Sequence, residues 1–281
     1  MDIEKIKKIS IRSLIDMKKK KEPIVFVTAY DYPSACRADR AGVDMIIVGD
    51  SIGMTMFGYD NTLAVTMNLM IPHVEAVCRA VKYAFVVGDM PYMSYQLSNI
   101  DAVKNASRFI RAGCSAVKCE GGGKGVTERI KSMVDSGTLV MGHLGLTPQN
   151  LAMLGGYTVQ GRNKESIDKL VKEAEAVRDA GAFAILLEAV PPEAGKRIAD
   201  SFKIPIYGIG AGPDVDGQLL IWHDIMGTFE GKLGNGVQIP KFAKRYTNIG
   251  ELEERALRKY AEEVRNLKFP TGKHCYRMDS Y

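Results

Sequence analysis

The stretch Met45-Ile46-Ile47-Val48-Gly49-Asp50-Ser51 joins a continuous apolar run to a glycine and two polar residues. A strand that is buried on both faces, as in a parallel sheet, has such a continuous run instead of an alternating one. Seven further short runs rich in apolar residues occur at residues 24–29, 84–88, 115–119, 138–142, 183–187, 205–209 and 218–222. The sequence therefore predicts a parallel sheet of eight strands.

Helical patterns lie between these runs, among them residues 101–112, 166–180 and 194–202. Gly113 and Gly181 follow two of them, where glycine commonly ends a helix. Strands that alternate with helices in this way predict a (β/α)8 TIM barrel, with the 281 residues in a single domain. We expect an N-terminal helical extension at about 1–22 and a C-terminal helical tail at about 250–281. A doubly wound open sheet is the alternative, because the sequence does not show closure.

Titratable residues follow five consecutive strands of this predicted barrel. They are Asp50 (with Ser51 beside it), Asp89, Glu120, His143 and Glu188. A single polar residue at a strand end can simply cap the next helix. Five in succession are hard to explain by capping, and barrel enzymes build their sites at the carboxyl ends of the strands. The pattern therefore predicts an active site at this face.

Three of these residues are carboxylates that would converge on the barrel axis. Asp50, Asp89 and Glu120 would repel one another unless a cation lay among them. Oxygen ligands without a nearby pair of cysteine and histidine residues favour a hard ion, and Mg²⁺ is the expected metal. The alternative is that the three are helix caps and paired surface acids.

Lys118 stands two residues before Glu120, so both side chains should point to the same side of their strand. A buried lysine beside carboxylates can be an ion-pair partner, a Schiff-base nucleophile or an anchor for a substrate carboxylate. With a metal present, anchoring the substrate is the favoured role. Cys119 should point outward, toward the helices.

His143 and Glu188 complete the predicted site. His143 is either a site residue or a hydrogen-bonded histidine at a strand end. Glu188 follows Ile185-Leu186-Leu187, and a carboxylate at the end of so apolar a strand suits a general base. The glycine run at residues 208–212 either cradles a phosphate or allows close backbone approach, and it is a weak signal alone.

Composition excludes several classes of protein. The chain has 38 basic and 33 acidic residues, a net charge of +5, and no dense basic stripe with aromatic residues, so we expect no nucleic-acid partner. Its five cysteines are scattered, which indicates free thiols and a reducing compartment. The charged N-terminus does not resemble a signal peptide, and no apolar run is long enough to span a membrane. We expect a cytoplasmic protein.

Longer motifs resemble those of the ketopantoate hydroxymethyltransferase family in order and spacing. The segments that carry the resemblance are residues 28–31, 48–54, 58–63, 89–93, 117–122, 142–149, 155–162, 188–191, 209–212, 240–244 and 269–270. They include Val48-Gly49-Asp50-Ser51-Ile52-Gly53-Met54 and Gly142-His143-Leu144-Gly145-Leu146-Thr147-Pro148-Gln149. The resemblance covers nearly the whole chain.

This resemblance implies a (β/α)8 barrel of the phosphoenolpyruvate mutase and isocitrate lyase superfamily, commonly a homodecamer. It implies transfer of a hydroxymethyl group from 5,10-methylenetetrahydrofolate to 3-methyl-2-oxobutanoate, on the route to pantothenate and coenzyme A. Carried over by position, Asp50 and Asp89 bind one Mg²⁺ per subunit, and Glu120 is a further ligand, directly or through water. The residues expected to contact the oxo acid are Asp50, Ser51, Asp89, Lys118 and His143, and Glu188 is the proton acceptor.

Two segments depart from the family pattern, at residues 68–82 and 227–239. The first has Leu69, Pro72 and Ala80 where an acidic residue, tyrosine and glycine are usual. One rival function is that of a carbon–carbon lyase of the same superfamily, but the Lys-Lys-Cys-Gly-His string typical of such lyases does not occur. The other is a catalytically inactive binding protein, which predicts the loss of metal or base residues that are all present.

Overall fold

The eight apolar runs form the strands of one closed parallel barrel in which each strand pairs with the next and β1 pairs with β8. A computed structural model describes residues 7–229 and 239–278. The strands are β1 (Ile24–Thr28), β2 (Met45–Val48), β3 (Phe85–Asp89), β4 (Ala116–Glu120), β5 (Val140–Gly145), β6 (Ala184–Glu188), β7 (Ile206–Ile209) and β8 (Gly217–Leu220). The predicted (β/α)8 barrel is confirmed, and the open sheet is wrong.

In most strands, alternate residues enter two different apolar clusters. In β2, Met45 and Ile47 belong to the cluster inside the barrel, whereas Ile46 and Val48 belong to the cluster between barrel and helices. This alternation is the two-residue period of a strand, and burial on both faces explains why the runs are continuously apolar. Cys119 lies in the outer cluster, as predicted.

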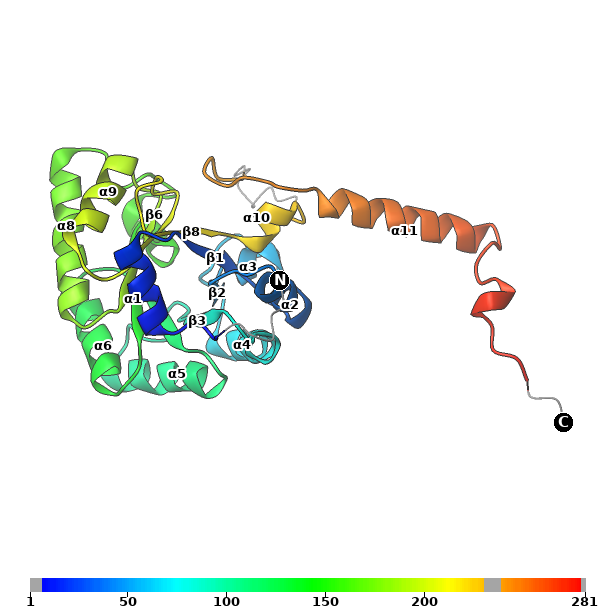
Figure 1. The fold of residues 1–281 in the computed structure, drawn as a ribbon, viewed down its shortest axis with the longest axis horizontal. Coiled ribbons are helices and arrows are strands. Elements are labelled where there is room, and N and C mark those ends of the chain that lie inside the picture. The colour runs from blue at the N-terminus through cyan, green and yellow to red at the C-terminus, as the bar shows by residue number, and fades with distance from the viewer. Residues whose placement is uncertain (1–6, 230–238, 279–281) are drawn as a thin grey trace.

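The longer helices between the strands lie around most of the outside of the barrel, and the short ones lie in the loops that follow the strands (Figure 1). They are α2 (Tyr32–Arg40), α3 (Ile52–Thr55), α4 (Met67–Ala80), α5 (Asn99–Arg111), α6 (Lys124–Asp135), η2 (Pro148–Asn150), α7 (Leu151–Leu154), α8 (Lys164–Asp179) and α9 (Pro192–Ser201). Several begin at a side-chain cap, such as Ser98 before α5 and Asn163 before α8, because these side chains accept the otherwise free backbone N–H groups. The segment 68–82 lies mostly in α4, which continues through Pro72.

The predicted N-terminal extension contains α1 (Ile11–Lys20), which joins the apolar cluster inside the barrel through the fully buried Leu14. Ile9 N donates to Tyr83 O, just before β3, so this segment lies against the amino ends of the strands. The helix therefore closes the face of the barrel opposite to the expected active site. Residues 1–6 lie outside the described range.

The C-terminal segment, unlike α1, contains a long helix that has no buried residue. After β8 come α10 (Trp222–Met226), α11 (Ile249–Arg265) and η3 (Gly272–His274), and α11 has no buried residue. Figure 1 shows α11 extending away from the barrel. Of the segment 227–239, which departs from the family pattern, residues 230–238, with Gly231, Gly234 and Gly236, lie outside the described range, as do residues 279–281. None of the described helices combines the length and the apolar character that a membrane span requires.

Candidate active site

A cavity of about 360 Å³ opens at the carboxyl ends of the strands. Every residue predicted for the site lines it: Asp50, Ser51, Asp89, Lys118, Glu120, His143 and Glu188. Strand register explains the convergence, because Asp89 pairs with Lys118 and Glu120 pairs with His143 across neighbouring strands. The predicted residues are therefore neighbours in one cavity.

Lys118 is the centre of a buried ion-pair network. Its Nζ lies 3.0 Å from Asp89 Oδ2 and 3.1 Å from Glu120 Oε1, and all three side chains are at most 4% exposed. Burial alone would lower the pKa of Lys118, but Asp89, Glu120 and Asp50 together raise it. The raised pKa favours the ammonium form of Lys118, which disfavours the Schiff-base alternative because a nucleophilic amine must be neutral.

Glu120 is fully engaged by its neighbours. Its Oε1 accepts from Lys118 and lies 3.2 Å from His143 Nδ1, and its Oε2 accepts from the backbone N–H of Gln149 at 2.9 Å. Burial raises the pKa of this carboxyl, but Lys118 and His143 outweigh burial and lower it to about 2. Glu120 is therefore ionised, with both oxygens occupied.

Within the described residues, Asp50 and Asp89 each have one oxygen with a hydrogen-bond partner and one without. Asp89 Oδ2 accepts from the backbone N–H of Asp50 at 3.1 Å and pairs with Lys118. Asp89 Oδ1 is buried and has no hydrogen-bond partner within the described part of the chain. Asp50 Oδ2 accepts from Gln149 Nε2 at 2.9 Å. Burial and the neighbouring carboxylates raise the pKa of Asp50, and burial and Glu120 raise that of Asp89 despite the ion pair with Lys118.

The carboxylates thus exceed the cations that the chain supplies. Among residues 7–229 and 239–278, no three His, Cys, Asp or Glu side chains form a ready metal-binding group. However, the unpartnered oxygen of Asp89 and the like-charge repulsion at Asp50 suit an additional cation. Mg²⁺ is commonly held by one or two carboxylates and completes its shell with water and substrate oxygens. The donor set of Asp50 and Asp89 fits Mg²⁺.

His143 lies between two glutamates. Its Nδ1 is 3.2 Å from Glu120 Oε1, and its Nε2 is 3.2 Å from Glu188 Oε2, although the second contact is not aligned as a hydrogen bond. Burial and Lys118 lower the pKa of His143, but the two glutamates raise it to about 9. An imidazolium at neutral pH would donate toward both carboxylates. Glu188 is 16% exposed and faces the cavity.

Sequence reasoning missed residues that hold this site together. Ser51 Oγ is 2.7 Å from the hydroxyl of Tyr30, whose pKa is raised to about 12, chiefly by burial. Tyr95 accepts from Glu120 N at 2.9 Å, and Gln149 contacts both Glu120 and Asp50. These residues lie in loops or a short 3₁₀ turn, where no strand or helix period marks them, although Gln149 ends one of the longer motifs.

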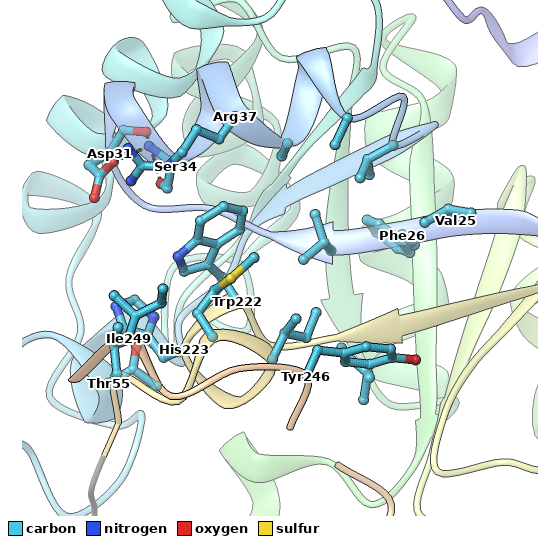
Figure 2. Close-up of a pocket in the computed structure, with 18 of the residues that line it drawn as sticks. Val25, Phe26, Asp31, Ser34, Arg37, Thr55, Trp222, His223, Tyr246 and Ile249 are labelled. Atoms are coloured by element: carbon cyan, nitrogen blue, oxygen red, sulfur yellow. Dashed lines mark hydrogen bonds between the residues drawn. The ribbon is translucent and has the colours of Figure 1, made fainter. Parts of the chain in front are cut away.

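A second, larger cavity of about 1110 Å³ lies elsewhere, beside β1, α2, β8 and α10. Figure 2 shows Trp222 at its centre, with Val25 and Phe26 on one side and Tyr246 on another. The guanidinium of Arg37 lies 5.7 Å from the centre of the Trp222 ring system. This cavity contains none of the predicted site residues, so it is not the candidate active site.

A protein-family model described as ketopantoate hydroxymethyltransferase matches residues 8–272. The 3-methyl-2-oxobutanoate hydroxymethyltransferase of Carboxydothermus hydrogenoformans is 47% identical over 272 residues, which cover 96% of this chain and 96% of that protein. The protein of the same name from Bacillus subtilis is 47% identical over 267 residues, covering 94% of each.

Solved structures share the barrel at much lower identity. A phosphonopyruvate hydrolase superposes with a TM-score of 0.59 at 14% identity and covers 94% of this chain and 92% of that chain. A 2,3-dimethylmalate lyase, described as a member of the PEP mutase/isocitrate lyase superfamily, superposes with a TM-score of 0.57 at 16% identity, covering 95% and 91%. At these identities the likeness concerns the fold alone.

Proposed function

The chain belongs to the ketopantoate hydroxymethyltransferase family, and we propose that it transfers a hydroxymethyl group from 5,10-methylenetetrahydrofolate to 3-methyl-2-oxobutanoate. The product is 2-dehydropantoate, a precursor of pantothenate and coenzyme A. The observation that carries the proposal is one cavity that combines Asp50, Asp89, Lys118 and Glu188 with partly unsatisfied carboxylates.

Asp50 and Asp89 would hold Mg²⁺, and Glu120 would steady a water ligand. A bound Mg²⁺ supplies Lewis-acid polarisation of the keto group, which makes the neighbouring C3 proton easier to remove. Asp89 is held in place by Lys118 and by the backbone of Asp50. Neighbouring groups thus hold both carboxylates in position, and each would offer its Oδ1 to the metal ion.

Lys118 would bind the carboxylate of the oxo acid. Two of its three ammonium protons face Asp89 and Glu120. Its third neighbour, His143 Nδ1 at 3.1 Å, cannot accept a proton when the imidazole is charged. One ammonium proton therefore stays available for a substrate carboxylate, and Ser51, which lines the same cavity, is a second donor.

Glu188 would accept a proton from the substrate or from water. Its carboxylate faces the cavity at the end of β6, on the opposite side of His143 from Glu120. With His143 Nε2 3.2 Å from Glu188 Oε2, the other carboxylate oxygen would be left to approach C3 of an oxo acid bound at Lys118. The wall also contains Met54, Tyr157 and Phe242, which give it apolar surface for the rings of a folate.

An assay of 2-dehydropantoate formation tests this proposal. Purified protein is incubated with the oxo acid, 5,10-methylenetetrahydrofolate and Mg²⁺, and the same reaction is run after chelator treatment. We expect turnover with Mg²⁺, loss of turnover with chelator, and recovery on adding Mg²⁺ or Mn²⁺. No product under any of these conditions would favour the inactive binding protein, and full turnover without metal would refute the metal site.

We also propose a cytoplasmic homo-oligomer, with the decamer that the family resemblance implies as the expected assembly. The five cysteines are free thiols, which suits a reducing compartment. The exposed α11 carries Leu257, Tyr260 and Val264, each at least 40% exposed. A second copy of the chain offers the groove of Figure 2, which is lined by β1, α2, β8 and α10.

A further inference from the structure

Gln149 lies at the meeting point of the proposed metal-binding carboxylates. It belongs to η2, the 3₁₀ turn that follows β5, and is 4% exposed. Its backbone N–H donates to Glu120 Oε2 at 2.9 Å, and its side-chain Nε2 donates to Asp50 Oδ2 at 2.9 Å. One residue thus connects the carboxylates that follow β2 and end β4.

The orientation of the Gln149 amide is fixed by its surroundings. Nε2 faces two groups that can only accept, the carboxylate of Asp50 and the carbonyl oxygen of Met90, each at 2.9 Å. Oε1 lies 3.1 Å from the hydroxyl of Tyr95 and 3.1 Å from Gln96 Nε2. A flipped amide would place oxygen against oxygen on one side and lose both acceptor contacts on the other.

This fixed amide determines which oxygen of Asp50 is available. Because Nε2 occupies Oδ2, Oδ1 is the oxygen left for an external ligand, in parallel with the unpartnered Oδ1 of Asp89. Without the amide, the Asp50 side chain could rotate about its terminal bond, since its remaining anchor is the backbone. Groups that orient metal-binding carboxylates in this way commonly matter as much as the ligands themselves.

We propose that Gln149 is the positioning residue of this site: it sets the rotation of Asp50 and the place of Glu120 so that a divalent cation meets two prepared oxygens. The inference rests on the proposed function for its metal, but it concerns binding of the cation and does not require turnover. Gln149 touches no reacting atom in this role.

The test measures Mn²⁺ affinity by electron paramagnetic resonance, without substrate, in the full-length protein. Gln149→Met keeps the length of the side chain and removes the amide, and Gln149→Glu replaces the donor with a repelling oxygen. We expect Gln149→Met to weaken Mn²⁺ binding by about 10–100-fold, and Gln149→Glu to weaken it at least as much. The matched control is Asn105→Leu, which removes another partly buried amide, bonded to Ser94 O at 2.7 Å, away from the carboxylates.

The steady-state readout separates positioning from general damage. If Gln149 acts through the cation, the loss of activity in Gln149→Met is recovered in large part at saturating Mg²⁺, whereas misfolding is not. Unchanged Mn²⁺ affinity in a folded Gln149→Met protein overturns the inference, whatever its activity. If wild type binds Mn²⁺ and forms no 2-dehydropantoate, the proposed function fails while this inference stands.

A second variant keeps the inference testable if Gln149→Met and Gln149→Glu do not fold. Gln96→Met removes the Nε2 donor to Gln149 Oε1 and the Oε1 acceptor of Tyr95 N, and it leaves both carboxylates untouched. We expect a smaller loss of Mn²⁺ affinity in the same direction. An affinity equal to that of wild type in this variant counts against the positioning role.

Discussion

Glu188 carries the sharpest expectation at the scale of single residues. We expect Glu188→Gln to fold and to bind Mn²⁺ with nearly unchanged affinity, because Asp50 follows β2 and Asp89 ends β3, whereas Glu188 ends β6. Glutamine keeps the shape of the side chain but accepts no proton, so turnover should fall by about 10²–10⁴-fold. Initial rates of 2-dehydropantoate formation measure the loss.

Deuterium exchange at C3 of the oxo acid, measured without folate, identifies the proton that Glu188 accepts. If Glu188→Gln stops the exchange, Glu188 takes the C3 proton. If exchange persists and transfer stops, it acts in a later hydrolytic step. Survival of both would show that Glu188 is not the proton acceptor.

Lys118→Ala tests the substrate anchor. We expect a higher KM for the oxo acid, since losing a hydrogen bond to a charged group costs about 1.5–3 kcal/mol. We also expect lower stability, because Asp89 and Glu120 would stay buried without their partner; breaking a buried pair costs about 3–5 kcal/mol. Urea unfolding and steady-state kinetics measure the two effects. Trapping of a substrate adduct on wild-type Lys118 with borohydride would restore the Schiff-base alternative.

The buried carboxyl of Asp224 should make the stability of the protein depend on pH. Burial raises the pKa of its carboxyl from 3.8 to about 6, with Arg245 opposing the rise, and the residue is 4% exposed. As the pH rises, the carboxyl of Asp224 therefore loses its proton in the unfolded chain before it does so in the folded protein. Asp224 thus lowers the free energy of unfolding progressively from about pH 4 to pH 6, and by a constant amount above pH 6.

Asp224→Asn should remove this penalty. One pKa unit corresponds to about 1.4 kcal/mol, so the variant should be more stable than wild type by up to about 3 kcal/mol at pH 7.5. At pH 4 the difference should nearly vanish. Urea unfolding at fixed protein concentration and at several pH values measures it, and a gain that does not depend on pH would contradict the assignment.

At the scale of elements, the end of β5 constrains the end of β6. Gly145 has φ +89°, and a Cβ placed there would lie 2.4 Å from the backbone oxygen of Glu188. Gly145→Ala should therefore cost about 1–3 kcal/mol for the left-handed backbone alone, and it should also displace Glu188 and lower kcat. Gly155→Ala is the matched control, because Gly155 has φ +72° and open space around it. Equal kcat in both variants would show that the contact with Glu188 is unimportant.

The strand ends were predictable because two regularities coincide there. Each apolar run sets the two-residue period that turns Asp89, Lys118, Glu120, His143 and Glu188 inward, and parallel pairing brings their carboxyl ends to one face. Loops have neither regularity, so the sequence pattern does not identify Tyr30, Tyr95 and Gln149 as residues of the site. Their positions depend on how each loop returns over the barrel, which no local period encodes.

The same limit applies to charge. The sequence showed three carboxylates but not how their oxygens are shared; in the described part of the chain both oxygens of Glu120 have partners, while one oxygen of Asp50 and one of Asp89 have none. The role of the glycine run at residues 208–212 likewise depends on packing between distant segments, which the sequence does not show. A Cβ at Gly210 would lie 2.4 Å from the ring of Phe242, and one at Gly212 would lie 2.7 Å from Pro192, so close packing already explains these glycines.

At the scale of the whole molecule, the barrel is incompletely covered on one side. Val25 of β1 is 52% exposed, although its neighbours Ile24 and Phe26 are buried, and the groove beside it measures about 1110 Å³. Helix α11, which comes after β8 and α10, touches this groove only through its first turn, with Ile249 and Glu253, and then extends away from the barrel (Figure 1). In a (β/α)8 barrel the outer face of each strand is normally covered by a helix.

Helix α11 has the pattern of a helix that packs against something. Leu257, Tyr260 and Val264 recur at spacings of three and four residues and are 66%, 55% and 40% exposed. Such a stripe on a helix normally faces an apolar surface. An apolar stripe and an uncovered apolar groove on the same chain complement each other if α11 of one copy packs into the groove of another.

Substitutions on either surface should therefore reduce the size of the assembly. We expect wild type to elute as an oligomer at micromolar concentration, and Leu257→Glu or Val25→Glu to shift the mass measured by light scattering toward smaller species. Burying one such side chain contributes about 1.5–3 kcal/mol, so each substitution should weaken association by at least tenfold. Lys259→Glu, on the opposite face of α11, is the matched control and should leave the mass unchanged. A monomeric wild type, or an unchanged oligomer in both Leu257→Glu and Val25→Glu, would show that α11 does not join the copies through this groove.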